Sequence, residues 1–137
     1  MDGCIFCKIA SHQIEKEEIF FEDEKVFAML DDDWTVKGHS LVVWKEHVAN
    51  MSDLSEDDFL HFSSVCRNVE ARLLKILHLN KSIVLKSGLL EPHFHFHIYP
   101  VTSDIQWDTV RDMLEKKIQY TPVNKEKEEL LIGLRNL

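Results

Sequence analysis

The sequence is poor in residues that loosen or cross-link a chain. Its 137 residues include 4 glycines and 3 prolines, which leaves little room for unstructured linkers. Its 3 cysteines are too few for a disulfide-rich secreted scaffold. The amino terminus, Met1-Asp2-Gly3-Cys4, lacks the basic and apolar segments of a signal peptide, and no apolar run approaches the length of a membrane span. We therefore expect a cytoplasmic protein without a membrane partner.

Positive charge is scarce as well. The chain has 16 lysines and arginines against 24 aspartates and glutamates, which gives a formal net charge of -8. An acidic surface repels long polyanions, so long nucleic acids are not expected partners. A small phosphate ligand is still compatible with this charge if its pocket is locally basic. The length and the 45% of hydrophobic residues suit one domain with its own core.

The pattern of apolar residues predicts an α+β fold, with a mostly antiparallel sheet of about five strands and helices on one side. The expected strands are Ile19–Glu22, Val26–Leu30, His39–Trp44, Ile83–Leu85 and His93–Tyr99. Ser55 and Asp58 form a capping box that indicates the start of a long core helix. The residues of this helix expected to face the core are Phe62, Val65, Val69, Leu73, Ile76 and Leu77.

The carboxyl-terminal part predicts two further amphipathic segments. The first spans Asp108–Tyr120, and the second is a highly charged helix over Lys125–Leu137. The proline of Thr121-Pro122 separates them because proline interrupts a helix. We expect C-terminal helices attached to the sheet.

One segment carries the chemistry, His93-Phe94-His95-Phe96-His97-Ile98-Tyr99. Successive side chains of a strand point to opposite faces, so the three imidazoles should line one face and the apolar side chains the other. Alternate residues stand about 6.5–7 Å apart. This spacing suits one imidazole attacking a phosphorus atom while a neighbour contacts a phosphoryl oxygen. Imidazole serves both roles because its pKa lies near neutrality.

Two other interpretations of this strand stay open. It could be a half-exposed strand whose polar face carries histidines without a chemical role. It could also hold zinc, since imidazoles ligate that ion. Three successive positions on one face of an extended strand converge poorly on a single ion, so other segments would have to supply ligands.

The alternation resembles the signature of the histidine triad superfamily, His-φ-His-φ-His-φ-φ with φ apolar. Three other segments, in the same order, are also similar to that family: Cys4–Ile9, Phe21–Asp31 and Lys37–His47. The resemblance is strongest to bacterial zinc-containing hydrolases of the superfamily. It implies a histidine triad nucleotide-binding catalytic domain, which we assign to residues 1–105, with residues 106–137 as a carboxyl-terminal helical extension of that domain.

The resemblance implies unequal roles for the histidines. His95 would be the nucleophile that attacks the α-phosphorus of a nucleotide and forms a nucleotidyl-histidine, which water or another phosphate then resolves. His97 would contact the phosphoryl oxygens and stabilise charge in the transition state. His39 matches a fourth family histidine that supports the triad through hydrogen bonds, although alone it could be an ordinary histidine at the start of a strand.

The resemblance also implies a nucleotide site. Asp31 matches the residue that accepts the ribose hydroxyls, which suits a carboxylate with several lone pairs. Taken alone, it could be a solvated charge in a turn. Residues matching the base pocket are of a kind that any core could hold, and they are Ile5, Phe6, Ile9 and Met29.

Cys4 and Cys7 have the spacing of two tetrahedral zinc ligands. Similar bacterial members complete the site with two histidines, which match His47 and His93 here. Zinc would then be a structural cofactor, since four protein ligands leave no open position for substrate. It would attach the amino terminus to the histidine strand and fix the orientation of His93. We interpret Cys66, on the long helix, as a small buried apolar residue.

The chain departs from the family just before the triad. The segment Leu85–Pro92 is several residues shorter and lacks the family's Gly-Gln-Ser/Thr phosphate contacts. Lys86 stands near a family Asn, and we expect it to supply a compensating positive charge to the substrate. Trp44 replaces a family proline, and we expect its indole at a dimer contact or on the surface.

The leading prediction is therefore a homodimeric enzyme that attacks the α-phosphate of a purine nucleotide compound, such as a dinucleoside polyphosphate or a nucleoside phosphoramidate. Its partner would be this small-molecule substrate. Two alternatives stay open: a nucleotide-binding or interaction module with little catalysis, and a phosphate-dependent nucleotidyltransferase.

Overall fold

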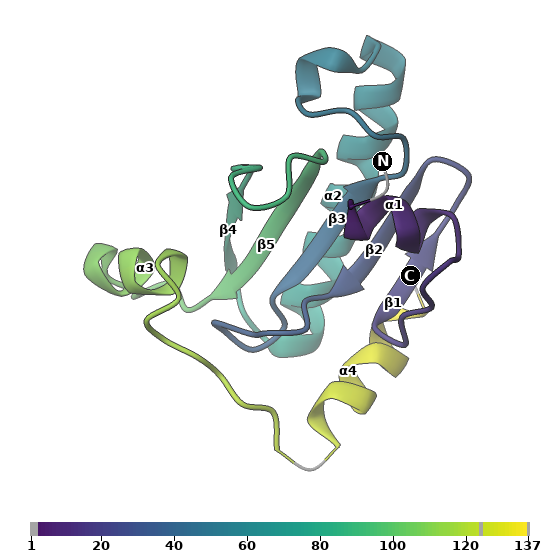
Figure 1. Cartoon of the computed structure of the whole chain (residues 1–137). Coiled ribbons are helices and arrows are strands. Elements are labelled where there is room, and N and C mark those ends of the chain that lie inside the picture. The colour runs from purple at the N-terminus through teal and green to yellow at the C-terminus, as the bar shows by residue number, and fades with distance from the viewer. Residues whose placement is uncertain (1–2, 124, 137) are drawn as a thin grey trace.

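Five antiparallel strands form a single sheet (Figure 1). The computed structural model describes residues 3–123 and 125–136. The strands lie in the order β1-β2-β3-β5-β4, and their bounds are β1 Ile19–Glu22, β2 Val26–Leu30, β3 Ser40–Trp44, β4 Lys81–Leu85 and β5 His95–Val101. Every neighbouring pair is antiparallel. The predicted α+β fold with a five-stranded antiparallel sheet is confirmed.

The long helix α2, Glu56–Leu77, covers one face of the sheet. It begins where Ser55 Oγ accepts a hydrogen bond from the Asp58 backbone N–H at 3.1 Å, which satisfies a donor of the first turn. Phe94 and Ile98 join the apolar core beneath it. The α2 residues predicted to face this core do so: Phe62, Val65, Val69 and Leu73 are buried, while Ile76 and Leu77 are partly buried. The alternation in β5 thereby leaves the opposite face to the histidines.

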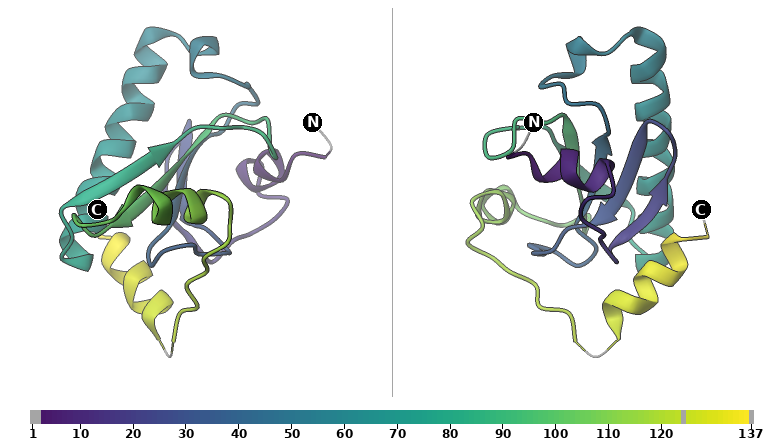
Figure 2. Two further views of the ribbon diagram at one scale, coloured as in Figure 1. Left: turned by 90° about the vertical axis from the view of Figure 1, so that its left-hand side faces the viewer. Right: turned by 45° about the vertical axis from the view of Figure 1, so that its right-hand side comes forward.

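A short helix, α1 (Ile5–Ala10), packs on that opposite face, as the two views of Figure 2 show. Its Phe6 and Ile9 contact the sheet residues Phe27 and Met29 in a second apolar cluster. Because both faces are covered, every residue of β2 and β3 is buried. The expectation of helices on one side only is wrong. A helix of six residues is too short to give a periodic signal in the sequence.

The tail contains two helices, α3 and α4, and both are shorter than the sequence predicts (Figure 1). α3, Trp107–Leu114, packs Met113 against Tyr99, and α4, Glu126–Leu134, contributes leucines to the α2 core. Residues 115–123, which follow α3, are not helical. Leu137, the predicted end of the last helix, lies outside the described residues. Among residues 3–123 and 125–136, no helix is both long enough and apolar enough to cross a membrane.

β5 begins at His95, two residues later than predicted, because the preceding residues form a bend. Phe94 donates its backbone N–H to the Val48 carbonyl at 2.7 Å and so ties the bend to the loop after β3. The expectation for Trp44 is wrong: its side chain is 3% exposed and lies 6.4 Å from the Phe62 ring, inside the α2 core. The wide gap between sheet and helix at this end accommodates an indole.

Candidate functional site

His95 is held with one ring nitrogen turned toward the backbone. Its Nδ1 lies 2.5 Å from the His93 carbonyl oxygen. Because a carbonyl only accepts hydrogen bonds, Nδ1 carries the proton and Nε2 keeps its lone pair. The Phe6 ring packs against the imidazole at a centroid distance of 4.7 Å, and burial lowers the pKa of His95. His95 is therefore a neutral imidazole with a basic nitrogen, as a nucleophile requires.

Beside it lies a group of three residues that we call the imidazole–carboxylate cluster: Asp31, His39 and His97. His39 Nε2 lies 2.9 Å from His97 Nδ1, so one ring donates a hydrogen bond to the other. Asp31 Oδ2 lies 3.5 Å from His39 Nε2 and 4.0 Å from His97 Nδ1. Burial lowers the pKa of each histidine to about 4. Both rings are therefore neutral at pH 7, despite the nearby carboxylate.

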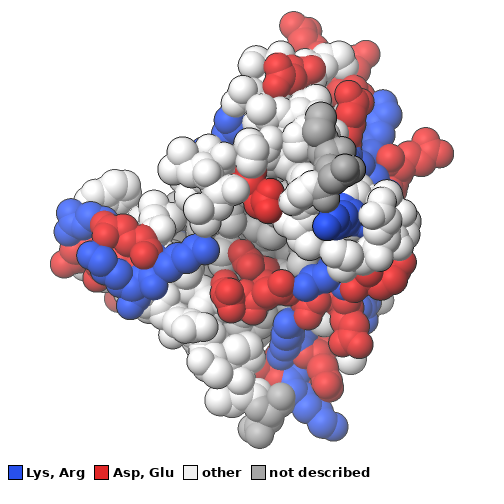
Figure 3. All heavy atoms as spheres, in the orientation of Figure 1, with Lys and Arg blue, Asp and Glu red and all other residues white. Residues whose placement is uncertain are grey.

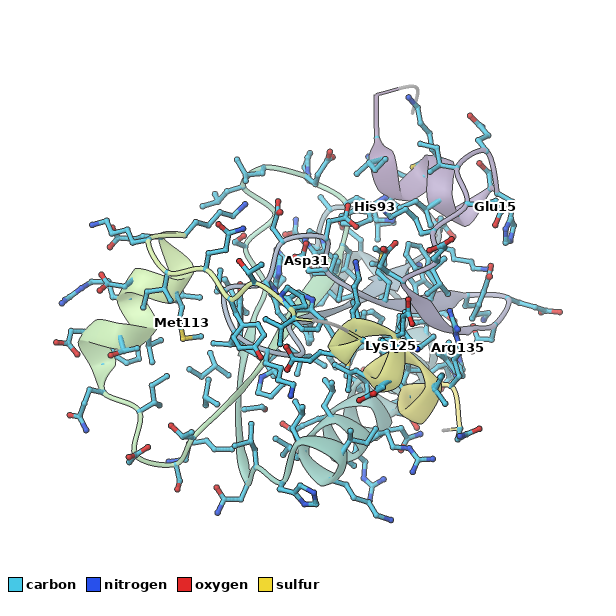
Figure 4. All side chains as sticks on the ribbon, turned by 90° about the horizontal axis from the view of Figure 1, so that it is seen from below. Glu15, Asp31, His93, Met113, Lys125 and Arg135 are labelled. Atoms are coloured by element: carbon cyan, nitrogen blue, oxygen red, sulfur yellow. The ribbon has the colours of Figure 1, made fainter. Side chains whose placement is uncertain are left out.

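His95 and His97 open into a cavity of about 470 Å³ between α1 and the tail. Figure 4 shows Asp31 near the middle of the molecule, between His93 beside α1 and Met113 on α3. His39 lines an adjoining cavity of about 240 Å³ that shares Asp31 and His97 with the larger one. The larger cavity is also lined by all five predicted base and ribose residues, Ile5, Phe6, Ile9, Met29 and Asp31.

Lys86 is not placed in either cavity, contrary to expectation. Its neighbours Leu85 and Ser87 line the larger one, and the side chain between them points the other way, where Nζ donates to Asn50 Oδ1 at 2.5 Å. Its charge still reaches His95, where burial is the main cause of the lowered pKa and Lys86 adds to it. The predicted positive charge is thus present only at a distance.

Two other lysines line the larger cavity, and no sequence motif indicated either. Lys16 precedes β1 and pairs with Asp32 at 2.8 Å. Lys116 follows α3 with a φ of 60°. In a sequence, such a left-handed conformation is usually indicated by glycine or asparagine, and here the residue is a lysine. Figure 3 shows basic side chains of the α3 region extending toward acidic ones in the middle of this face.

Beside the first turn of α1, two sulfur and two nitrogen ligands converge. We call this group the cysteine–histidine cluster: Cys4, Cys7, His47 and His93. Their ligand atoms all lie within 4.8 Å of one another, so together they could hold a metal ion. Cys4 Sγ lies 3.3 Å and Cys7 Sγ 3.5 Å from His93 Nδ1, while His47 Nδ1 lies 3.2 Å from both Cys7 Sγ and His93 Nδ1. Three segments far apart in the sequence supply these ligands.

The geometry of this cluster fits a tetrahedral ion. With metal–sulfur bonds of about 2.3 Å and metal–nitrogen bonds of about 2.0 Å, tetrahedral angles place sulfur and nitrogen roughly 3.5 Å apart and two nitrogens roughly 3.3 Å apart. The observed separations of 3.2–3.5 Å agree with both. His93 Nε2 bonds to the Trp44 carbonyl oxygen, which fixes the proton there and leaves Nδ1 free to ligate.

A groove of about 380 Å³ lies between α2 and Phe21 of β1. It is lined by Phe21, Val65, Asn68, Val69, Ala71, Arg72 and Lys75. None of these is a nucleophile with an adjacent base, whereas the histidine cavity combines a buried imidazole with converging polar groups. We therefore assign the candidate site to the histidine cavity.

Comparison with known proteins agrees with this assignment. The model of the HIT domain family matches residues 12–104. An uncharacterised HIT-like protein of Methanocaldococcus jannaschii is 35% identical over 101 residues, covering 71% of this chain and 78% of the relative. A protein of Schizosaccharomyces pombe named adenosine 5'-monophosphoramidase is 32% identical over 102 residues, covering 72% of this chain and 74% of the relative.

Solved structures give the same fold. A hypothetical histidine triad nucleotide-binding protein of Sulfolobus tokodaii has a TM-score of 0.76 at 24% identity, covering 97% of this chain and 90% of the other. A Zn-bound histidine triad family protein of Mycobacterium smegmatis has a TM-score of 0.73 at 18% identity, covering 98% and 95%. Because the family model matches most of its length and a relative is 35% identical over 101 residues, this chain belongs to the histidine triad (HIT) family.

Proposed function

We propose that this protein is a nucleotidyl hydrolase that uses His95 to attack the α-phosphorus of a purine nucleotide compound. The observation that carries the proposal is the hydrogen bond from His95 Nδ1–H to the His93 carbonyl. It orients the ring and leaves the Nε2 lone pair available, next to a cavity large enough for a nucleotide.

The cavity offers matching contacts for the substrate. Phe6 and Met29 would hold the base, because purine rings gain from stacking on apolar and aromatic surfaces. Asp31 would accept the ribose hydroxyls, since its Oδ2 faces the cavity side while Oδ1 accepts the Asp33 backbone N–H. The α-phosphate would then lie at His95, which lines the same cavity.

The reaction would proceed by two displacements. His95 Nε2 forms a bond to the α-phosphorus as the bond from phosphorus to the leaving nitrogen or oxygen breaks and its electron pair departs with that atom. A leaving nitrogen takes up one proton from solvent and departs as the neutral amine. Water then attacks the same phosphorus, the phosphorus–nitrogen bond breaks, its electron pair returns to Nε2, and the water releases one proton to solution. The products are a nucleoside monophosphate and neutral His95.

His39 would orient His97 for this reaction. If His39 Nε2–H donates to His97 Nδ1 across 2.9 Å, the proton of His97 is on Nε2, where it can hydrogen bond a phosphoryl oxygen. With a pKa of about 4, His97 keeps this neutral donor form throughout the neutral pH range. The name of the fission yeast relative, adenosine 5'-monophosphoramidase, supports a nucleotide substrate of this kind.

We also propose that the cysteine–histidine cluster binds zinc as a structural ion. The mixed sulfur and nitrogen donors, their tetrahedral spacing and the Trp44 carbonyl behind His93 suit zinc. The likeness to a Zn-bound neighbour supports this choice. The cluster would fix His93, whose carbonyl in turn restrains the nucleophile.

The test is incubation of the full chain with adenosine 5'-phosphoramidate, diadenosine tetraphosphate and AMP, followed by product analysis and mass spectrometry of the quenched protein. We expect AMP as a product and an adenylyl adduct on His95. Absence of turnover and of the adduct across the panel would favour a nucleotide-binding module. Release of ADP that depends on added phosphate would favour a transferase.

A further inference from the structure

Lys116 lies at the candidate site, although no sequence motif indicated it. It lines both the cavity of about 470 Å³ and the adjoining one of about 240 Å³. The family model ends at residue 104, so Lys116 lies in the tail beyond the matched segment. An exposed lysine that lines both hollows can contact a ligand bound in either.

The backbone is arranged to present this side chain. Lys116 has a φ of 60°, which is unfavourable for any residue with a Cβ. The turn is held by hydrogen bonds from the Lys116 N–H to the Met113 carbonyl at 3.0 Å and from the Lys117 N–H to the Asp112 carbonyl at 2.8 Å. Met113 is buried, so α3 fixes the turn to the sheet. The position of the lysine is therefore set by packed structure.

Lys116 differs from the other cation of the cavity by having no partner. Lys16 is bound to both oxygens of Asp32, at 2.8 and 2.9 Å. For Lys116, no carboxylate of residues 3–123 or 125–136 lies within ion-pair distance. Among the described cavity-lining residues it is the one ammonium group whose donors are available to a ligand.

The position along β5 indicates which part of a substrate would reach it. Phe6 of the proposed base pocket packs on His93 and His95, with ring centroids 5.6 and 4.7 Å apart. Lys116 instead lines both cavities together with His97, the proposed contact of the phosphoryl oxygens. A phosphate held at His97 therefore lies in the same hollows as Lys116.

We propose that Lys116 binds the phosphate groups of the leaving group, so that this site favours substrates with an anionic, phosphate-containing leaving group over those that release a neutral amine. The inference rests on the proposed function. As His95 Nε2 bonds to the α-phosphorus, the bond to the bridging oxygen breaks and its electron pair remains on the departing phosphate. The Lys116 ammonium group hydrogen bonds that phosphate and stabilises the added charge.

A cation is needed there because the surroundings are acidic. Asp31, Asp32 and Glu91 all line the larger cavity, and the whole chain has a net charge of -8. A polyphosphate leaving group would meet these carboxylates unless a positive charge lay between. Lys86, which the sequence suggested for this purpose, is turned toward Asn50. Lys116 would supply the charge that the shortened loop before His93 does not.

The test compares kcat/KM for diadenosine tetraphosphate and adenosine 5'-phosphoramidate, which share the attacked adenylyl group. Lys116→Ala should lower the value about tenfold for the tetraphosphate and less than about twofold for the phosphoramidate, as expected for one charge-assisted hydrogen bond. Lys116→Arg should retain most of the activity. The matched control is Lys117→Ala, because Lys117 is 64% exposed and pairs with Glu115 at 2.9 Å. Equal losses on both substrates, or no loss, would overturn the proposal.

A binding measurement separates this inference from the proposed function. The affinities of AMP and ATP are measured by calorimetry for His95→Asn and for His95→Asn with Lys116→Ala, in buffer without magnesium and without chelator. The inference predicts that ATP binds more tightly than AMP and that Lys116→Ala removes about tenfold of this advantage. Failure of wild-type turnover with this result intact would reject only the hydrolase. Unchanged ATP affinity in the double variant would reject the role of Lys116.

Discussion

Two histidine-containing clusters each take one residue from the segment His93–His97, yet the environments of these two histidines differ. The cysteine–histidine cluster uses His93, and none of its four members lines the histidine cavity. The imidazole–carboxylate cluster uses His97, and all its members line a cavity. Its two nitrogens, 2.9 Å apart, satisfy each other by a hydrogen bond, whereas the ligands around His93 have tetrahedral spacing. The neighbours of the two rings differ accordingly: thiols and a second imidazole surround His93, whereas a carboxylate and a second imidazole lie beside His97.

The largest effect is expected from replacing His95, the proposed nucleophile, which lies between His93 and His97 in the sequence. His95→Asn retains a donor near the position of Nδ1 for the His93 carbonyl but lacks Nε2. We expect kcat to fall by at least about 10³-fold, because the covalent step is lost. Bound zinc, measured by mass spectrometry of the digested metal, should remain as in the wild type. A variant that keeps a tenth of the activity would rule out His95 as nucleophile.

Removing a thiol of the cysteine–histidine cluster should abolish metal binding, which the His95 variant retains. Cys7→Ser should lose the metal ion and lower the melting temperature by on the order of 10 °C, because binding of a structural ion is coupled to folding. Activity should fall as a consequence, through the His93 carbonyl. The control is Cys66→Ala on α2, whose thiol lies in the apolar core and has its pKa raised by burial to about 12. If Cys7→Ser and Cys66→Ala retain the same zinc content, the cluster is not the metal site.

The second cluster should make stability depend on pH. Burial lowers the pKa of His39 and His97 to about 4, against about 6.5 in an unfolded chain. The unfolded state therefore takes up protons first, so the stability contributed by these neutral rings is complete above pH 6.5 and is lost as the pH falls toward 4. We expect the free energy of unfolding to drop by a few kcal/mol, on the order of 2, over that interval.

NMR titration of the imidazole resonances measures this directly. Both His39 and His97 should stay neutral down to about pH 5, while His61, which is 44% exposed on α2, provides a comparison in the same spectra. A midpoint at pH 6.5 or above for either ring would contradict the buried neutral pair.

Replacing Asp31 should give the smallest of these effects, a loss of kcat/KM that depends on the sugar of the substrate. Asp31→Asn replaces an oxygen that can accept a ribose hydroxyl by an amide, and we expect about a tenfold loss of kcat/KM for an adenosine substrate. With the 2',3'-dideoxy analogue the loss should be within about twofold. Asp104→Asn, which replaces a carboxylate that lines neither cavity, serves as the control. Equal losses on both sugars would show that Asp31 acts through the histidines instead.

The sequence predicted those features that depend on short-range periodicity. The strands from Ile19 to Trp44 and the helix capped by Ser55 follow from alternation, helical spacing and a local hydrogen bond. The four residues of the cysteine–histidine cluster came from a family resemblance, and the structure brings them together. A bend at His93 was not predicted, because a loop hydrogen bond from Phe94 to Val48 interrupts the strand pattern.

Features that depend on long-range packing could not be predicted. α1 is too short to show a period, yet it closes the nucleotide cavity. Whether Lys86 or Lys116 faces the cavity depends on the direction of two loops, and one of these adopts a left-handed backbone without glycine. Trp44 fills the space between sheet and helix, which no local pattern reveals.

The turn that carries Lys116 has a consequence for divergence within the family. It lies beyond residue 104, outside the segment by which the family is recognised, and it is joined to the body mainly through Met113 and a hydrogen bond from the Tyr120 N–H to the Trp34 carbonyl at 2.8 Å. Mutations in such a tail can alter leaving-group preference while the nucleophile and its restraint stay the same. Paralogues that share the triad can therefore acquire different metabolic assignments through their carboxyl termini alone.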